Sequence, residues 1–131
     1  MKDVDKAVKA YSAIFGATAP PIHTAGQLQL PKDYQGDPKA FVKTTELRTN
    51  SVEIHLLEPV GGISPWRDGL DKYGDGSLQH ISFGVTDLPG TIEALRKVGG
   101  TLVSGGPTSI YAYMRFQQLP FIIELEKVPA Q

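Results

Sequence analysis

Apolar residues recur at helical spacing in two separate segments of the chain. In DVDKAVKAYSAIFG, residues 3–16, they share one face of a helix that Asp3 can cap at its start and Gly16 at its end. In DLPGTIEALRKVGG, residues 87–100, a similar stripe follows Asp87 and has a proline in the first turn. Both segments are therefore predicted to be amphipathic helices. The stripes consist of Val4, Ala7, Val8, Tyr11, Ile14 and Phe15 in the first, and of Leu88, Ile92, Leu95 and Val98 in the second.

The two predicted helices are matching parts of an internal repeat. An offset of 84 residues superposes Asp3 on Asp87 and Gly16 on Gly100, with apolar positions matched in between. Strand-like runs follow each helix. They read AFVKTTELRT and SVEIHLLEP after the first helix, and TLVSGG, IYAYMRFQQ and PFIIELEK after the second. We interpret the halves as two copies of one strand-helix-three-strand unit, an α+β fold.

The first copy lacks its first strand. In the second half, LQHISFGV leads directly into the helix cap, whereas the matching segment of the first half would fall before residue 1. We expect units at 1–60 and 78–131, joined by a linker at 61–77 that carries a short helix capped by Ser64 and opened by Pro65. The segment APPIHTAGQLQLPKDYQGDPK is expected to hold a weak strand and a long mobile loop.

Three of the predicted strands combine an apolar face with one ionisable residue in mid-strand on the opposite face. Alternation places His55 in SVEIHLLEP, His80 in LQHISFGV and Glu124 in PFIIELEK opposite the large apolar side chains. Two histidines and a carboxylate are the side-chain set of a first-row divalent metal site with open positions. A lone strand histidine is more often a hydrogen-bonded surface or core residue than a metal ligand. The prediction therefore depends on all three residues occurring at mid-strand positions together. His23, in PPIHT, is not expected to be a ligand.

The composition and charge of the chain limit the classes of molecule that we expect it to bind. The 131 residues are 40% apolar, with 13 Lys plus Arg against 14 Asp plus Glu, a formal charge of -1. No general attraction to nucleic acid or anionic lipid follows, so we expect a small-molecule substrate or another protein chain as partner. There is no cysteine, which leaves His, Asp, Glu, Gln and backbone groups to hold a metal. No apolar run approaches the length of a membrane span and the N-terminal residues do not read as a signal peptide, so we expect a cytoplasmic protein.

With these motifs, the sequence resembles the vicinal oxygen chelate superfamily. These are the paired βαβββ proteins that include glyoxalase I, methylmalonyl-CoA epimerase, extradiol dioxygenases and antibiotic-resistance binders. The resemblance runs from Asp3 to Lys127. VEIHLLEPVGGISPWRDGLDKYGDGSLQHISFGVTDL is similar to the epimerase and lyase branch in its EP turn, its SP-capped short helix, its GDG exit and its His-bearing strand. FIIELEK is similar to the closing strand. The resemblance implies a curved, mostly antiparallel sheet around a central cup.

In this family the metal ligands lie on the first and fourth strands of each unit. Carried onto this chain, the resemblance implies His55, His80 and Glu124 as ligands of a divalent ion, which could be Co, Ni, Zn, Mn or Fe. Relatives in the epimerase branch have Gln or Glu where His55 stands, and the first-strand ligand of the first half has no counterpart. Three protein ligands still suffice for a catalytic site with open positions.

The function that these residues favour is a metal-dependent isomerase, epimerase or lyase acting by enolate stabilisation on a small carbonyl or acyl-CoA type substrate. Glu124 is the candidate for one catalytic base and Glu46 for the other, although Glu46 and Lys43 also fit solvated charges. A non-haem Fe(II) ring-cleaving dioxygenase remains an alternative, because it uses the same ligand set.

A metal-free protein that binds a small molecule is the other alternative. Aromatic residues could line its cup, although strand aromatics more often belong to a core. They are Trp66, Tyr111, Tyr113 and Phe116. The missing strand leaves an unpaired sheet edge, which another chain, a rearranged N-terminus or an upstream segment could fill. We therefore expect a homodimer, possibly a strand-exchanged one.

Overall fold

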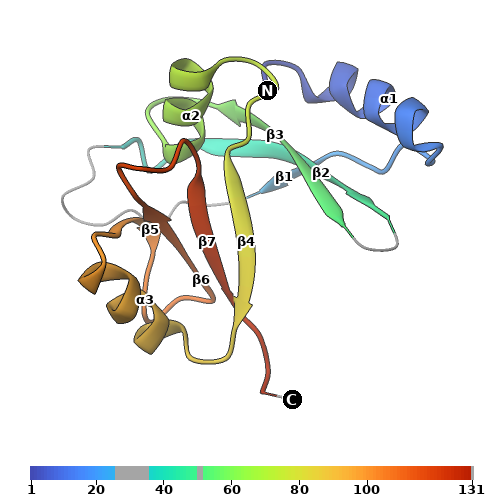
Figure 1. Cartoon of the computed structure of the whole chain (residues 1–131). Coiled ribbons are helices and arrows are strands. Elements are labelled where there is room, and N and C mark those ends of the chain that lie inside the picture. The colour runs from blue at the N-terminus through green and yellow to red at the C-terminus, as the bar shows by residue number, and fades with distance from the viewer. Residues whose placement is uncertain (26–35, 50–51, 131) are drawn as a thin grey trace. The chain divides into compact units, whose positions relative to one another are not determined.

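The structure is a computed structural model that describes residues 1–25, 36–49 and 52–130. Its contacts divide these residues into two compact units, each described here by itself. Unit 1 comprises 1–25 and 39–77 within the described ranges, and unit 2 comprises 36–38 and 78–130. Unit 1 contains α1 (Val4–Phe15), β1 (His23–Ala25), β2 (Phe41–Arg48), β3 (Glu53–Val60) and α2 (Pro65–Tyr73) (Figure 1). Unit 2 contains β4 (His80–Val85), α3 (Leu88–Lys97), β5 (Thr101–Gly105), β6 (Tyr111–Arg115) and β7 (Ile122–Lys127).

The three helices of the described residues begin where the sequence predicts. The side chain of Asp3 accepts a hydrogen bond from the backbone N–H of Lys6, and α1 ends at Gly16 in the left-handed conformation. Asp87 caps α3 in the same way, and Ser64 caps α2 with Pro65 in the first turn. Capping side chains satisfy backbone N–H groups that the first helical turn leaves without partners. These boundaries are therefore set locally by a few residues.

The sheet of unit 1 has three antiparallel strands in the order β1-β2-β3. α1 packs on one face of this sheet, where four fully buried side chains form a core: Val4, Val8, Leu47 and Leu56. No strand precedes α1 in the described part of the chain, as predicted. β3 consequently forms one edge of the sheet.

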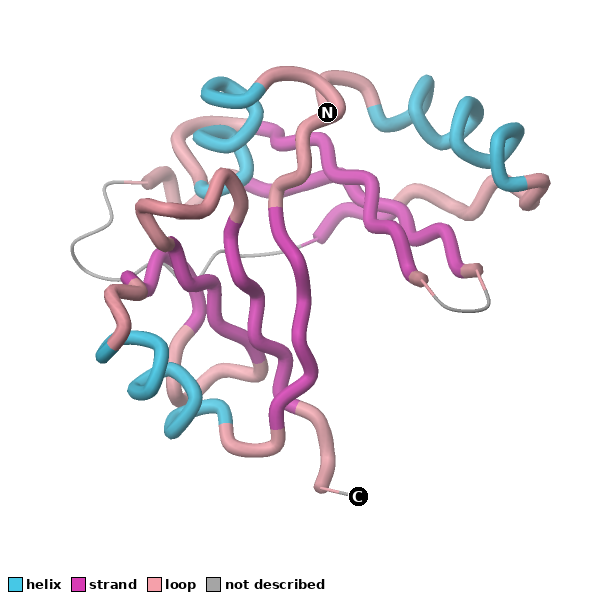
Figure 2. Tube along the Cα trace, viewed as in Figure 1, coloured by secondary structure: helices cyan, strands magenta, loops and turns pink. Residues whose placement is uncertain are grey.

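Unit 2 contains the complete strand-helix-three-strand order. Its four strands lie side by side in the order β4-β7-β6-β5; β4 pairs with β7 in parallel and the other pairs are antiparallel (Figure 2). α3 packs over β5, β6 and β7, and the shared core consists of Leu88, Ile92, Ala112, Met114 and Leu125. A side chain at Gly105, where φ is +70°, would collide with the carbonyl oxygen of Tyr111, so glycine is required where β5 turns toward β6. The predicted α+β class is confirmed.

Two details of the predicted apolar faces are wrong. Ile81 and Phe83 of β4 were expected to pack under a helix, but they are 38% and 49% exposed. The reason is that β4 forms the edge of its sheet, while α3 lies over the other three strands. Ile14 and Val98, which match in the repeat, are 74% and 68% exposed, because both stand in or just after the last helical turn, beyond the sheet core.

The weak strand predicted in the segment after α1 corresponds to β1, which begins at His23. The long loop predicted after it falls mostly on residues 26–35, outside the described residues. None of the described helices has the length and apolar character needed to cross a membrane.

Truncation of Ile92 tests the packing of α3. Ile92 is 1% exposed, so Ile92→Ala leaves a cavity and should lower the free energy of unfolding by about 2–5 kcal/mol. Val98→Ala, at the exposed end of the same segment, should change it by less than about 0.5 kcal/mol. Urea unfolding followed by circular dichroism measures both. Equal effects of the two substitutions would contradict the described core.

Candidate metal centre

In unit 2, the sheet face opposite α3 carries a cluster of polar side chains. The parallel register places Ser82 of β4 beside Glu124 of β7, and the antiparallel register places Tyr113 of β6 on the other side of Glu124. His80 lies two residues before Ser82 on the same strand, and so it projects from the same face. From the sequence alone, alternation had placed His80 and Glu124 opposite the large apolar side chains of their strands, but it gave no partner to either of them.

His80 and Glu124 are in direct contact. The Nε2 atom of His80 lies 3.1 Å from Oε2 of Glu124, and each side chain is only 10% exposed. Ser82 donates a hydrogen bond from its hydroxyl to the same Oε2 atom, at 2.6 Å. Burying an ionisable pair costs free energy unless the two groups satisfy each other's hydrogen-bonding capacity. The contacts with His80 and Ser82 do this for the carboxylate of Glu124 and hold it in one orientation.

The ring of His80 contacts oxygen atoms at both of its nitrogens, since Nδ1 lies against Oε1 of the neighbouring Gln79. An amide oxygen only accepts, so Nδ1 carries a hydrogen. The other nitrogen then has two possible states. As an imidazolium it donates to Glu124; as a neutral ring it directs a lone pair at a carboxylate oxygen, and a cation between the two acceptors relieves that repulsion.

Aromatic rings adjoin this cluster. The ring of Tyr113, which is buried, lies 5.4 Å from the imidazole of His80 between centroids, and Tyr111 packs edge-on against Tyr113 at 5.5 Å. The hydroxyl groups of Tyr111 and Ser104 are hydrogen-bonded at 3.0 Å. Phe116, in contrast, packs against the core under α3. Of the aromatic residues proposed to line a cup, the two tyrosines therefore adjoin the polar cluster.

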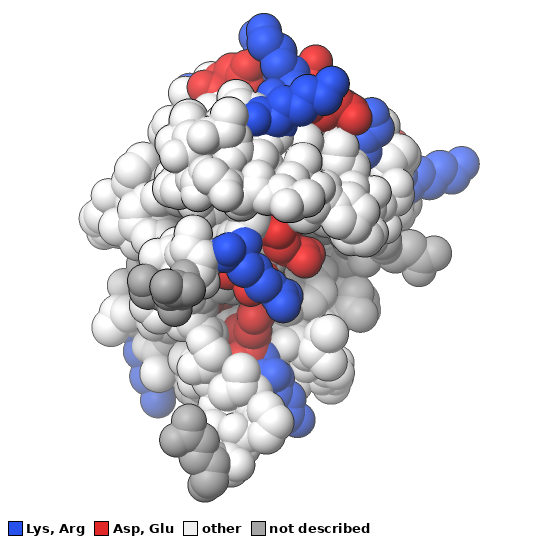
Figure 3. Space-filling view, turned by 90° about the vertical axis from the view of Figure 1, so that its right-hand side faces the viewer, with Lys and Arg blue, Asp and Glu red and all other residues white. Residues whose placement is uncertain are grey.

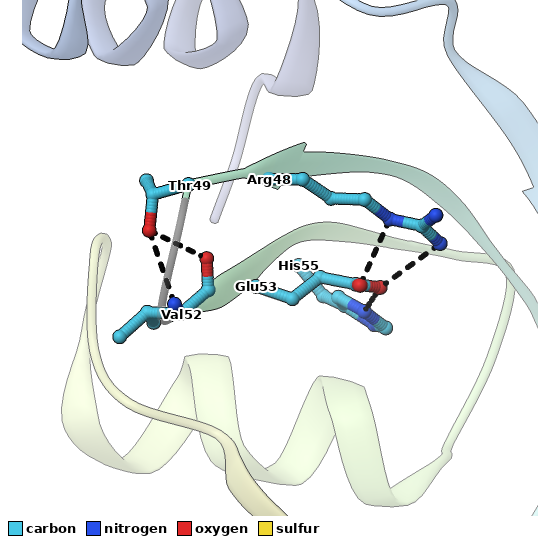
Figure 4. Close-up of polar contacts among 5 residues, drawn as sticks. All are labelled: Arg48, Thr49, Val52, Glu53 and His55. Carbon is cyan, nitrogen blue, oxygen red and sulfur yellow. Dashed lines mark hydrogen bonds and ion pairs between the residues drawn. The ribbon is translucent and has the colours of Figure 1, made fainter.

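In unit 1, His55 stands on β3 among polar side chains. Its Nε2 atom lies 2.7 Å from Oε1 of Glu53, and the Nε atom of Arg48 lies 2.9 Å from Oε2 of the same carboxylate (Figure 4). Glu46 is paired with His55 across the β2–β3 ladder, so the two side chains share a face of the sheet. His23 is exposed on β1.

The hydrogen bond from His55 lowers the pKa of Glu53 below its ordinary value, and the positive charge of Arg48 acts in the same direction. Glu53 therefore stays ionised at neutral pH. Glu53 and Arg48 were not predicted to be site residues from the sequence. The available signal was their spacing: Glu53 is two residues before His55, and Arg48 faces Glu53 across the ladder.

The structure thus brings together two of the three predicted ligands, His80 and Glu124, within unit 2. His55 and the candidate base Glu46 lie side by side in unit 1. The participation of His55 in one site with the other two stays a prediction.

A different acidic group also comes together among the described residues. Possible ligand atoms of Asp3, Asp5 and Glu58 lie within 4.8 Å of one another at the start of α1. Their contacts are structural: Glu58 accepts from the backbone N–H of Val4, and Asp3 caps the helix. Lys43 forms an ion pair with Glu58 at 3.5 Å. Negatively charged side chains at the start of a helix stabilise it through the helix dipole, and this does not require a bound ion.

Near α1, at the upper end of Figure 3, charged side chains of both signs stand next to each other. The first residues of the chain show the same mixture, with Lys2, Asp3, Asp5 and Lys6 in close succession. The start of α1 therefore offers no patch of one sign.

The donor set of unit 2 fits a divalent ion. An imidazole nitrogen and a carboxylate oxygen are both donors that such ions accept, and Nε2 of His80 and Oε2 of Glu124 lie 3.1 Å apart on one face of the sheet. Gln79 and Ser82 supply the outer hydrogen bonds that orient ligands in metal sites.

Comparison with known proteins identifies the family. The family model described as the Glyoxalase/Bleomycin resistance protein/Dioxygenase superfamily matches residues 1–116. No curated protein matches the chain. Among solved structures, the hypothetical protein BH1468 from Bacillus halodurans C-125 is similar, with a TM-score of 0.64 and 20% identity over 100% of this chain and 90% of that chain. At this identity the likeness shows the fold alone.

A second solved structure, the trypanothione-dependent glyoxalase I of Leishmania major, has 18% identity and a TM-score of 0.36 over 97% of this chain and 80% of that chain. The family match is the stronger finding, because it covers most of the sequence. The resemblance inferred from the strand and helix motifs is thereby confirmed at the level of the superfamily: this chain belongs to the glyoxalase/bleomycin resistance protein/dioxygenase superfamily.

Proposed function

We propose that this protein is a metal-dependent isomerase, epimerase or lyase that acts on a small carbonyl or acyl-CoA type substrate by stabilising an enolate. The observation that supports this most is the buried contact between His80 and Glu124, two side chains of metal-ligand chemistry on adjacent strands. Membership in the superfamily supports it as well, because the superfamily includes glyoxalase I along with dioxygenases and resistance proteins.

The residues that would hold the ion are His80, Glu124 and His55, and the candidate ions are Co, Ni, Zn, Mn and Fe. When bound, a divalent ion supplies Lewis-acid chemistry, lowering the cost of negative charge on a substrate oxygen while the adjacent carbon loses its proton. The buried setting favours this, since charges interact more strongly where water is excluded. The aromatic wall of Tyr113 and Tyr111 would restrict water on one side of the cluster.

Proton transfer would be the task of two carboxylates. Glu124 is the first base: Ser82 and His80 both engage its Oε2 atom, which fixes the plane of the carboxylate. Glu46, beside His55 on the neighbouring strand of unit 1, is the second base. Bases on opposite sides of one carbon would permit inversion at that carbon.

Two other functions fit the same residues, and the tests below distinguish them from the proposed one. A non-haem Fe(II) ring-cleaving dioxygenase uses two histidines and one carboxylate, and it would consume oxygen with a catechol substrate. A metal-free protein that binds a planar molecule would use the tyrosine wall and gain no stability from divalent ions.

We also propose that the protein forms a homodimer, possibly with strand exchange. β4 forms the edge of its sheet and exposes the large apolar side chains of Ile81 and Phe83. A sheet edge with apolar side chains favours pairing with another strand. A second copy of the chain offers the same edge, which fits a symmetric contact.

Substitution of the ligands should weaken metal binding. His80→Ala, Glu124→Ala and His55→Ala should each lower the affinity for Co²⁺ on the order of 100-fold, because each removes one donor from a three-donor set. His23→Ala, which changes an exposed histidine on β1, should leave the affinity unchanged. Competition with a chelating dye measures all four. A His80→Ala variant that binds Co²⁺ like the unmodified protein would rule out the site.

Removal of one base at a time should separate proton exchange from inversion. With saturating metal, Glu124→Gln should slow exchange of the carbon-2 proton of a racemic 2-methylacyl-CoA about 10²–10⁴-fold. Glu46→Gln should preserve exchange on one enantiomer and abolish inversion. Mass spectrometry in D₂O and chiral analysis read the two processes separately, and Glu93→Gln on α3 is the control. Oxygen consumption with a catechol and Fe(II), in place of exchange, would establish the dioxygenase alternative.

The dimer proposal predicts that a charge on the β4 edge separates the two copies. Phe83→Glu should convert the dimer to a monomer in size-exclusion chromatography with light scattering, because burying an unpaired carboxylate at the contact is unfavourable. Ile110→Glu, at a side chain that is 77% exposed outside β4, should leave the dimer intact. A monomeric unmodified protein at micromolar concentration would refute the proposal.

A further inference from the structure

The hairpin of β2 and β3 holds a line of three charged or ionisable side chains: Arg48, Glu53 and His55. Arg48 faces Glu53 in the ladder, and its Nε and Nη2 atoms lie 2.9 and 3.5 Å from the two carboxylate oxygens. His55 is two residues further along β3, so it projects from the same face as Glu53 (Figure 4). The carboxylate of Glu53 thus lies between a guanidinium and an imidazole.

The contact between Glu53 and His55 determines where the imidazole carries its hydrogen. Oε1 of Glu53 is 2.7 Å from Nε2 of His55. A carboxylate oxygen only accepts hydrogen bonds, and a contact of 2.7 Å is a hydrogen bond, so Nε2 is the protonated nitrogen. In the neutral ring the lone pair is then on Nδ1, the atom by which such an imidazole binds a metal.

We infer that Glu53 is a positioning residue of the proposed metal site, which fixes His55 as its Nε2–H tautomer and presents Nδ1 as the ligand atom. This inference rests on the proposed function. Metal-binding histidines commonly donate their other ring N–H to a carboxylate, which orients the ring and raises the basicity of the ligand nitrogen. Arg48 keeps Glu53 in place through its two contacts.

His80 shows the complementary arrangement. There Nδ1 faces the side-chain oxygen of Gln79, and Nε2 faces Glu124. Each histidine therefore has a side-chain oxygen from a residue one or two positions upstream against one ring nitrogen.

An ordinary surface ion pair is the competing explanation. Arg48, Glu53 and His55 are 71%, 39% and 35% exposed in their side chains, and exposed ion pairs contribute little to stability. Such a pair fixes the tautomer of His55 through the same hydrogen bond, but it leaves metal affinity unchanged. A positioning role also affects metal affinity, so the affinity for Co²⁺ separates the two explanations.

The test uses the full chain and two measurements on Glu53→Ala, Glu53→Gln and Glu93→Ala. Glu93 also belongs to an exposed ion pair, with Arg96 on α3, and serves as the matched control. Long-range ¹H–¹⁵N NMR of the metal-free protein, above the titration range of imidazole, reports the tautomer of His55. Competition with a chelating dye reports the affinity for Co²⁺.

In Glu53→Ala, the Nε2–H tautomer should give way to a mixture, and Co²⁺ should bind about 10–100-fold more weakly. Glu53→Gln, whose amide oxygen can accept the same hydrogen bond, should recover most of both. Glu53→Ala in a His55→Ala background should have no further effect on affinity, because the residue acts through His55.

An unchanged tautomer in Glu53→Ala would overturn the inference, as would unchanged Co²⁺ affinity or an equal loss in Glu93→Ala. Failure of the proposed function gives a different result: the unmodified protein would then bind no Co²⁺ at all. The NMR measurement needs no metal, so it tests in either case whether Glu53 fixes the tautomer of His55.

Discussion

The candidate site depends on the parallel pairing of β4 with β7. This pairing brings Ser82 and Glu124, which are 42 residues apart in the chain, into contact and places His80 next to them. Parallel strands need a long connection between them, and here α3, β5 and β6 provide it. The core under α3 therefore stabilises the sheet whose opposite face carries the polar cluster.

The cluster is chemically constrained by its low exposure. Glu124 is 8% exposed, and a carboxylate at that depth must be satisfied by nearby donors or by a cation. Ser82 supplies one donor, and His80 supplies either a second donor or a lone pair, depending on its protonation. The same two atoms can therefore form a hydrogen-bonded pair or two ligands of an ion, which relates the fold of unit 2 to the proposed chemistry.

The two units carry their histidines in different surroundings. His80 is nearly buried and lies beside a tyrosine ring, whereas His55 is about one-third exposed and held by an exposed carboxylate. Glu53, itself held by Arg48, contacts the ring of His55. The two strands are alike in one respect, because β3 and β4 each form an edge of their own sheet.

The sequence by itself determined the elements and their faces. Helix caps at Asp3, Ser64 and Asp87 act through bonds to residues three positions away, and alternation along a strand is a property of the extended backbone. For this reason the α+β order, the repeat, and the placement of His80 and Glu124 opposite the apolar faces of their strands could be predicted. The family followed from the same motifs, and the match over residues 1–116 agrees with it.

Only the tertiary structure decided which side chains touch. The contacts of Glu124 with His80 and Ser82 depend on strand register, which is fixed by packing between residues far apart in the chain. The exposure of Ile81 and Phe83 depends on β4 being an edge strand, a fact of sheet order that alternation does not contain. The contact between Glu53 and His55 likewise depends on the geometry of β3, because a pattern of charges in the sequence does not specify the distance between two atoms.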